Sequence, residues 1–335
     1  MTQRLKAYHL RFLTPVHPGI ESIGQEKTEE TIRSDTLWGA LIQCWLLLFD
    51  DNCNDLVADP IFKISSCFPL IDENRFFPVP LGAFDGAMEE ASRRPPGFVP
   101  SVKDLKKVRY ISESLFKDLL AGNNITLEKL IEEQVYSSFE GETSRFLLTT
   151  QRPRIRTDQL AGGVYEDAFF YCTDNFFGKN AGLYFFASFE NDEARDKFEA
   201  ALRLLGDTGL GGDRSIGRGL FTYESREFYV KEVKDEPLYC LMSLYRPSQQ
   251  EVSEGILFHN DSAYGLIRRW GRAASVYTSK FRRSDTWMLT EGSVLPFAPN
   301  GTIPVVLEKN EEIPHRVYRY GLALTIPISR RGLGR

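Results

Sequence analysis

The sequence GLGGDRSIGRGLF, residues 209–221, places five glycines and two arginines within thirteen positions. Each glycine loses more conformational entropy on folding than any other residue, so close contacts must compensate for such a loop. Two kinds of contact would do so: main chain that bends sharply against another part of the fold, or main chain that closely approaches a ligand. The elements on either side of the loop narrow the choice of fold.

The glycine loop lies between a predicted helix and a predicted strand. Residues 182–189 (GLYFFASF) and 220–230 (LFTYESREFYV) have the apolar patterning of strands. Residues 191–206 predict a helix capped by Asn191 and ended by Gly206, and its apolar face carries Ala194, Phe198, Ala201, Leu202 and Leu205. Nucleotide-cradling glycine loops instead run strand, loop, helix, and no GK[ST] is present here, so a P-loop or Rossmann motif is not favoured.

The N-terminal residues repeat this strand–helix order. Residues 3–12 predict a strand, and residues 34–49 predict a helix with Ser34 as N-cap and Asp35 in its first turn. The helix places one apolar stripe toward the core, at Trp38, Leu41, Ile42, Trp45, Leu48 and Phe49. Two such units predict an α+β fold with a ferredoxin-like, RRM-like βαββαβ domain, which is also the scaffold of many RNA-recognition modules.

The remaining residues divide into an insertion, a hairpin and a second domain. Residues from about 70 to 145 are broken by prolines and predict an irregular insertion with a short helix after Ser112. Residues from about 145 to 172 predict a β-hairpin on which Arg152, Arg154 and Arg156 alternate toward one face. The first domain is placed at residues 1–235 and the second at 236–335.

The charge distribution matters more than the net charge of −5. Residues 145–156, 262–284 and 313–335 are basic and contain no acidic residue. Such stretches on one face can bind phosphate while another face stays acidic. The alternative is that they are solvated faces with ordinary ion pairs.

Several classes of protein are disfavoured by composition. Five cysteines without a CxxC pair indicate reduced thiols in a cytoplasmic protein, and four histidines without HxxxH or HExxH spacing give no zinc signature. The most apolar run, residues 37–49, is too short to cross a bilayer. We therefore expect no cofactor, metal or membrane partner.

The combination of motifs resembles a known family. A ferredoxin-like domain with GLGGDRSIGRGLF between its last helix and last strand resembles the RAMP superfamily of CRISPR-associated RNA-binding proteins. PVHPG (residues 15–19) followed by RSDTLWGAL (33–41) resembles the type III-A (Csm-type) effector subunit that caps the tag end of the guide RNA. Further matches are RPRIRTD (152–158), MSLYRP (242–247), TEGSV (290–294) and YRYGLALTIPI (318–328). One departure is Gln159 after Asp158, where the hairpin commonly carries an Asp-Arg pair.

The resemblance implies a non-catalytic RNA-binding subunit with two tandem ferredoxin-like domains and an inserted arginine-rich hairpin. Such a subunit holds the repeat-derived 5′ tag of the guide RNA (crRNA) and bridges the large polymerase-like subunit to the backbone RAMP subunits. The predicted RNA contacts are Gly209, Gly211, Gly212, Arg214, Ser215, Gly217, Arg218, Gly219, Arg152, Arg154, Arg156, His17, Arg33, Ser34, Arg268, Arg269 and Arg272.

Two of these groups have alternative interpretations. Loop glycines without Cβ would bring amides close to phosphate while Arg214 and Arg218 add charged hydrogen bonds, unless these arginines pair with Asp207 or Asp213. The segment around Trp270, with Arg268, Arg269 and Arg272, predicts either a stacking-plus-charge patch or a helix whose Trp faces the core.

A rival function is a metal-free guide-processing endoribonuclease with His17 as general acid or base. Processing nucleases on this scaffold generally end soon after the glycine loop, whereas more than a hundred residues follow it here. A pure protein scaffold without RNA contact leaves the acid-free arginine stretches unexplained.

Overall fold

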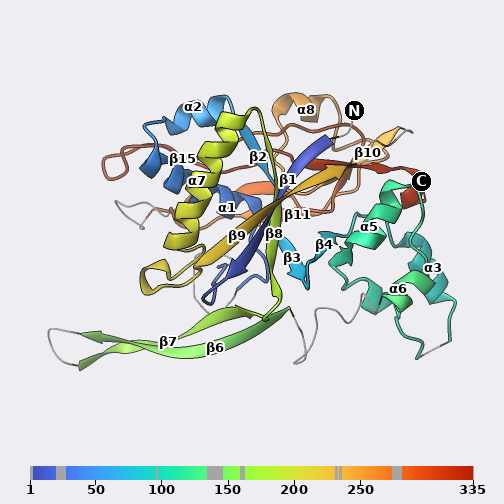
Figure 1. Cartoon of the computed structure of the whole chain (residues 1–335), viewed down its shortest axis with the longest axis horizontal. Helices are drawn as coiled ribbons and strands as arrows, with labels where there is room; N and C mark the ends of the chain where they lie inside the picture. The colour runs from blue at the N-terminus through green and yellow to red at the C-terminus, as the bar shows by residue number, and fades with distance from the viewer. Residues whose placement is uncertain are drawn as a thin grey trace.

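A seven-stranded antiparallel sheet forms the centre of the molecule (Figure 1). The computed structural model describes residues 3–19, 28–95, 97–133, 146–158, 163–230, 233, 236–273 and 281–334. Strands pair in the order β5-β4-β3-β8-β1-β9, and β2 also pairs with β8. The strands are β1 (Gln3–Phe12), β2 (Phe62–Ile64), β3 (Phe68–Ile71), β4 (Asn74–Pro78), β5 (Tyr110–Ser112), β8 (Ala181–Phe189) and β9 (Phe221–Val230).

Two helices, α1 (Ser34–Leu48) and α7 (Asp192–Thr208), pack against one face of this sheet. Tyr8 of β1 and Phe185 of β8 point into the same core as Trp45 of α1 and Phe198 of α7. The alternation of a strand sends Leu5 and Ala7 to the opposite face and into a second core. The order β1, α1, β3, β8, α7, β9 is the predicted βαββαβ order.

The ends of the two helices differ from the predictions by one or two residues. The cap residue of α1 is Arg33, and Ser34 is the first helical residue. Asn191 caps α7 as predicted, because its side chain accepts a hydrogen bond from the Ala194 amide. Gly206 does not end α7, which continues to Thr208. A Cβ on Gly206 would lie 2.5 Å from the carbonyl oxygen of Phe221, so this glycine permits close packing of helix and strand.

The insertion is more regular than its prolines suggested. β4 and β5 extend the central sheet, and the helix expected after Ser112 is α5, which Ser112 caps. Among the described prolines of the insertion, Pro78 ends β4, and Pro80, Pro95 and Pro100 lie in the connections between elements. The helices between residues 53 and 133 are α2 (Cys53–Ala58), α3 (Asp85–Ser92), α4 (Val102–Leu105), α5 (Glu113–Leu120) and α6 (Leu127–Glu132).

The C-terminal half contributes to the second core of the N-terminal half. Its own hydrophobic cluster, around Tyr245 and Leu289, is smaller. Leu238 and Ile326 share that core with Leu5, Phe77 and Phe186 of the N-terminal half. The described residues after 236 contain one α-helix, α8 (Gln249–Ser253), whereas a βαββαβ domain has two, so the tandem arrangement stays a prediction for this half. The strands here are β10 (Pro237–Leu241), β11 (Leu266–Arg269), β12 (Thr286–Leu289), β13 (Val294–Leu295), β14 (Val305–Leu307), β15 (Val317–Tyr318) and β16 (Thr325–Ser329).

A long hairpin projects from the body of the molecule (Figure 1). β6 (Leu147–Asp158) and β7 (Gly163–Phe177) pair antiparallel with each other and form their own two-stranded sheet. The predicted hairpin is therefore present, with a returning strand five residues longer than expected. All five cysteines are free thiols. No helix in the described ranges is long and apolar enough to span a membrane.

Candidate nucleic-acid interface

Three segments far apart in the sequence meet at the base of the hairpin. The main chain of Val16 exchanges two hydrogen bonds with Asn175 of β7, of 3.0 and 2.9 Å. The glycine loop joins the same segment, because Gly212 donates to the His17 carbonyl (2.9 Å) and Gly219 to the Pro15 carbonyl (2.8 Å). The fold therefore brings the PVHPG segment, the hairpin and the glycine loop together.

The loop glycines allow the main chain to approach itself. An ideal Cβ would lie 2.0 Å from the Leu210 oxygen at Gly219, 2.2 Å from the Arg218 oxygen at Gly209 and 2.8 Å from the His17 oxygen at Gly211. These three glycines also have positive φ values of 72°, 88° and 101°. Of the two contacts considered for the loop, sharp bending against the rest of the fold accounts for these glycines.

Most loop amides already have carbonyl partners. Gly209 donates to Leu205, and Gly217 donates to Arg214, in addition to the bonds of Gly212 and Gly219 described above. The predicted mechanism, in which these four amides face a phosphate, is therefore corrected. Ser215, in the short 3-10 turn η1 (Arg214–Ile216), is exposed and the Arg214 side chain reaches Gln43 of α1 at 3.5 Å.

Two ion pairs connect the glycine loop to the hairpin. Arg218 Nη2 lies 2.8 Å from Asp174 Oδ2, and Arg154 Nη1 lies 2.8 Å from Asp213 Oδ2. Arg152 Nε lies 3.4 Å from the same Asp174 oxygen, but its side chain is 48% exposed. Arg218 therefore pairs with a carboxylate, but with Asp174 and not with Asp207 or Asp213, and the partner of Asp213 is Arg154. Arg152 is therefore more exposed than Arg154. The side chain of the third hairpin arginine, Arg156, lies outside the described residues.

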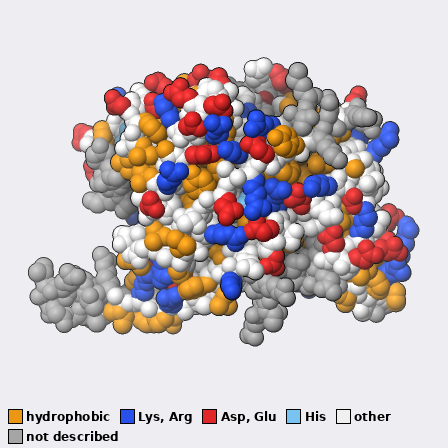
Figure 2. All heavy atoms as spheres, in the orientation of Figure 1, with side chains coloured by type: hydrophobic (Ala, Val, Ile, Leu, Met, Phe, Trp, Pro, Cys, Tyr) orange, Lys and Arg blue, Asp and Glu red, His pale blue; other side chains and the backbone are white. Residues whose placement is uncertain are grey.

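The hairpin has a basic face and an apolar face. The register pairs Arg154 with Phe170 on one face and Ile155 with Phe169 on the other. The second face is exposed: Ile155 and Phe169 are 54% and 55% accessible, and the Phe169 ring packs edge-on against Tyr171. Figure 2 shows Lys and Arg side chains beside hydrophobic ones over this part of the molecule. A hairpin with this arrangement can contact phosphates on one side and bases or apolar groups on the other.

His17 is part of the packing at this junction. Its side chain is buried, and Nδ1 lies 2.6 Å from the Thr173 carbonyl oxygen. The ring also lies under the loop, since a Cβ on Gly212 would be 3.0 Å from its Cδ2. The structure accordingly positions His17 as a link between hairpin and loop.

Arg33 is half-buried and bound by two carboxylates, and Ser34 is buried inside the protein. Arg33 pairs with Glu29 (2.9 Å) and Glu291 (2.8 Å), and these two carboxylates compensate its positive charge. Ser34 is fully buried: its amide donates to Ser66 Oγ and its hydroxyl accepts from the Leu244 amide. Ser34 is therefore removed from the predicted RNA contacts, and it fixes α1 to the C-terminal half instead.

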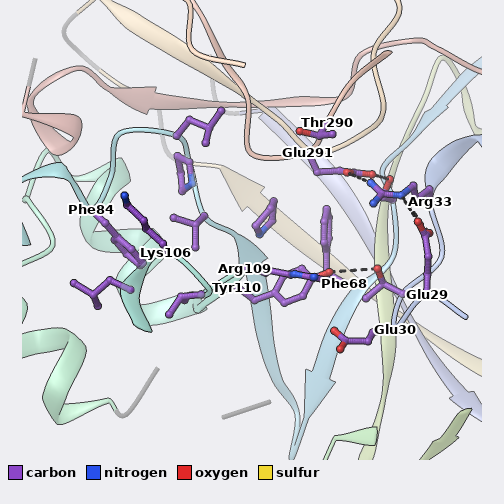
Figure 3. A pocket seen from close by; sticks show the side chains of 18 of the residues that line it. Glu29, Glu30, Arg33, Phe68, Phe84, Lys106, Arg109, Tyr110, Thr290 and Glu291 are labelled. Atoms are coloured by element: carbon purple, nitrogen blue, oxygen red, sulfur yellow. Dashed lines mark hydrogen bonds and ion pairs between the residues drawn. The ribbon is translucent and has the colours of Figure 1, made fainter. Parts of the chain in front are cut away.

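The Arg33 ion pairs form one wall of a cavity of about 750 Å³ (Figure 3). Phe84 and Lys106 lie at the other end of this cavity, on the insertion. Carboxylates and cations both line it, so its charge does not favour a polyanion.

The predicted patch around Trp270 follows a strand and not a helix. Arg268 pairs with Asp285 on the neighbouring segment, and Arg282 lies over the Trp270 ring at 4.9 Å. Arg272 is exposed. Arg269 is buried with both ends of its guanidinium on Asp35 (3.0 and 2.9 Å), so it is an internal ion-pair partner and not an exposed RNA contact.

The acidic partners of these arginines are not marked in the sequence. For Asp35 the sequence indicates only a helix-dipole role, and for Asp174 it indicates none. Both pair with arginines distant in the chain, and no local spacing marks such pairs. No group of three or more His, Cys, Asp or Glu side chains in the described part is arranged to hold a metal ion.

Comparison with known proteins places these features in a family. The RAMP superfamily matches residues 9–222. The chain belongs to the RAMP superfamily. In this RAMP protein, residues 234–328 also match the CRISPR Csm4 C-terminal domain. The resemblance drawn from the motifs is thus confirmed at both levels.

One relative of this RAMP protein matches along most of its length, and another matches along slightly less than half. The CRISPR system Cms protein Csm4 of Thermococcus onnurineus (strain NA1) is 24% identical over 306 residues, covering 88% of this chain and 91% of the relative. The protein of the same name from Methanocaldococcus jannaschii is 25% identical over 177 residues, 45% of each chain.

Solved structures share the fold. A chain in the Csm3-Csm4 subcomplex of the type III-A CRISPR-Cas interference complex has a TM-score of 0.62 at 18% identity, covering 98% of this chain and 100% of that one. A chain in the Csm1-Csm4 cassette in complex with cA4 has a TM-score of 0.61 at 18% identity, covering 98% of both.

Proposed function

We propose that this chain is the Csm4 subunit of a type III-A CRISPR effector complex and that it binds the 5′ tag of the guide RNA without cleaving it. The observation that carries the proposal is the junction of hairpin, PVHPG segment and glycine loop, with Arg152 and Arg214 on its accessible side. The names of the similar structures support a large-subunit partner (Csm1) and a backbone partner (Csm3) for the same chain.

Binding would use the two faces of the hairpin differently. Arg152 and Arg154 lie on the basic face, where guanidinium groups make charge-assisted hydrogen bonds to phosphate oxygens. Phe169 and Tyr171 lie on the apolar face, where aromatic rings can stack on unpaired bases. The hairpin would thereby hold single-stranded RNA by backbone charge and by stacking.

The geometry of His17 favours binding over cleavage. A general acid or base must come within hydrogen-bond reach of the reacting group. The Nδ1 atom of His17 is already 2.6 Å from a main-chain carbonyl, and the side chain is 5% exposed. His17 is therefore poorly placed to act as the general acid or base of an endoribonuclease.

The proposal is tested with the full chain and a labelled tag RNA. Arg152→Gln with Arg214→Gln removes one exposed and one half-buried charge, and it leaves the Arg218–Asp174 and Arg154–Asp213 ion pairs in place. We expect affinity for the tag RNA to fall about tenfold, and the slope of log K against log salt to fall by about 1.4, which is about 0.7 for each phosphate that is no longer neutralised.

A matched control uses two arginines that are paired elsewhere on the surface. Arg195→Gln with Arg316→Gln removes the same charge from groups bonded to Asp192 and Glu308. This double variant should bind the tag RNA as the wild type does. Equal losses in both double variants would mean that net charge alone drives binding, and no loss in either would remove the junction from the RNA site.

A further inference from the structure

Three arginines from the C-terminal half surround the single carboxylate in the first turn of α1. Asp35 accepts hydrogen bonds from Arg269 at both oxygens and from Arg319 Nη1 at 3.0 Å. Arg283 lies close enough for its charge to act on Asp35, although no carboxylate of the described residues lies within ion-pair distance of it. We call Arg269, Arg283 and Arg319 the arginine cluster.

Positive charge exceeds negative charge in this buried place. The side chains of Asp35 and Arg319 are only 4% and 1% exposed. The neighbouring carboxylates of Glu29 and Glu291 are both bonded to Arg33, so they do not reach the cluster directly. Within the cluster one carboxylate faces three guanidinium groups, and when Arg33, Glu29 and Glu291 are counted as well, four cations face three carboxylates, an excess of one positive charge.

Several donors of the arginine cluster have no acceptor. Nε and Nη2 of Arg319 and Nε of Arg283 are buried and make no hydrogen bond within the described part of the chain. Buried charged donors without partners are costly and rare, so each calls for an acceptor beyond the described residues. Water could satisfy the donors but would leave the charge excess in place.

The surroundings favour an anion as the missing acceptor. The amino end of α1, a fifteen-residue helix, adds the positive end of its dipole at Asp35. Arg272 and Arg282 are exposed beside the cluster, and their main chains form an isolated antiparallel β-bridge. Burial lowers the pKa of Arg319 to about 10 and also lowers the pKa of Arg283, as expected for cations that lack enough counter-charge.

We infer that the arginine cluster, in which Arg283 is half-buried, is a phosphate-binding site and that its phosphate belongs to the RNA backbone. The first part stands on the buried donors and the charge excess alone. The second part rests on the proposed function, and it gives the guide RNA a contact at the joint between the two halves of the chain, away from the hairpin.

The phosphate site is tested on the protein without RNA. Sodium phosphate at low millimolar concentration is compared with sodium chloride at equal ionic strength, and the Tm is measured for wild type, Arg283→Gln and the control Arg316→Gln. We expect phosphate to raise the Tm of wild type and control by roughly 5 °C at about 100 times its Kd, and to leave that of Arg283→Gln unchanged. Equal shifts in all three proteins, or no shift in wild type, would overturn the site.

The RNA assignment is tested with the same variants and the tag RNA. Arg283→Gln should reduce the salt slope by about 0.7 while Arg316→Gln does not. Loss of the phosphate shift with an unchanged RNA slope would assign the site to a free phosphate compound and overturn the RNA part. If wild type fails to bind tag RNA at all, the proposed function fails, and the phosphate measurement still decides the site.

Discussion

Arg218 of the glycine loop and Asp174 of the hairpin are joined by an ion pair of 2.8 Å in which the carboxylate is 1% exposed. Arg152 approaches the same oxygen from the opposite strand at 3.4 Å. A single buried charge thus ties the loop to the hairpin and orients the arginine on the accessible face. The loop and the hairpin base are therefore linked by charge, and both are hydrogen-bonded to the PVHPG segment between them.

Asp174→Asn should destabilise this link strongly. The substitution keeps the shape of the side chain but leaves Arg218, 13% exposed, without its counter-charge. Removing one partner of a buried pair typically costs about 3 kcal/mol or more. Urea unfolding of the variant measures this, with Asp196→Asn as control, because Asp196 pairs with Arg195 at the surface and should change stability by less than about 0.5 kcal/mol. Equal effects would show that the Asp174 pair is not structural.

The loop glycines should differ sharply in their tolerance of a methyl group. Gly219→Ala places a Cβ 2.0 Å from the Leu210 oxygen and should cost more than about 3 kcal/mol or prevent folding. Gly217→Ala has a similar positive φ of 78° but no atom within 4 Å, so it should cost only about 1 kcal/mol. Unfolding free energies of the two variants test this, and similar values would contradict the close approach at Gly219.

The elements that could be predicted from the sequence are those in which apolar residues recur at regular spacing over ten or more residues. β1, α1, α7 and β9 appear within one or two residues of their expected bounds, because each buries one stripe against a sheet or helix. Most short helices of the insertion could not be predicted because four to eight residues carry little periodicity, although the capping box of Ser101 and Asp104 at α4 is a local signal.

The candidate site was predictable in its parts but not in its pairing. Residue type identifies the glycines, the arginines and His17, and the fold brings many of them to one junction. Their partners follow from tertiary register: Arg269 meets Asp35 across 234 residues, and Arg218 meets Asp174 on a separate sheet. These pairings decide which arginines stay accessible, so residue type alone overestimates the exposed charge.

Acid should weaken the protein partly through His9 of β1. Burial lowers the pKa of His9 from 6.5 to about 4, and the charges of Arg75 and Arg226 add to the lowering. Because the folded pKa lies below the unfolded value, the unfolded chain takes up a proton first as the pH falls. The contribution of His9 is therefore fully present above pH 6.5 and is lost between pH 6.5 and 4, by about 3 kcal/mol.

Replacement of His9 isolates this contribution. His9→Gln removes the titration, so the unfolding free energy of the variant should depend less on pH than that of wild type between pH 4 and 6.5. Urea unfolding at several pH values gives both curves. Parallel curves for the two proteins would assign the acid sensitivity to carboxylates instead.

His17→Ala should reduce stability without affecting any cleavage of RNA. The substitution removes the hydrogen bond to the Thr173 carbonyl and the ring that packs under Gly212, at a cost of about 2 kcal/mol. His315→Ala is the matched control, because His315 is exposed and its replacement should leave stability nearly unchanged. Thermal unfolding reports the first effect, and incubation with repeat RNA in chelator reports the second: all three proteins should leave the RNA intact. Products that form with wild type and His315→Ala but vanish with His17→Ala would establish a nuclease and reverse the proposed function.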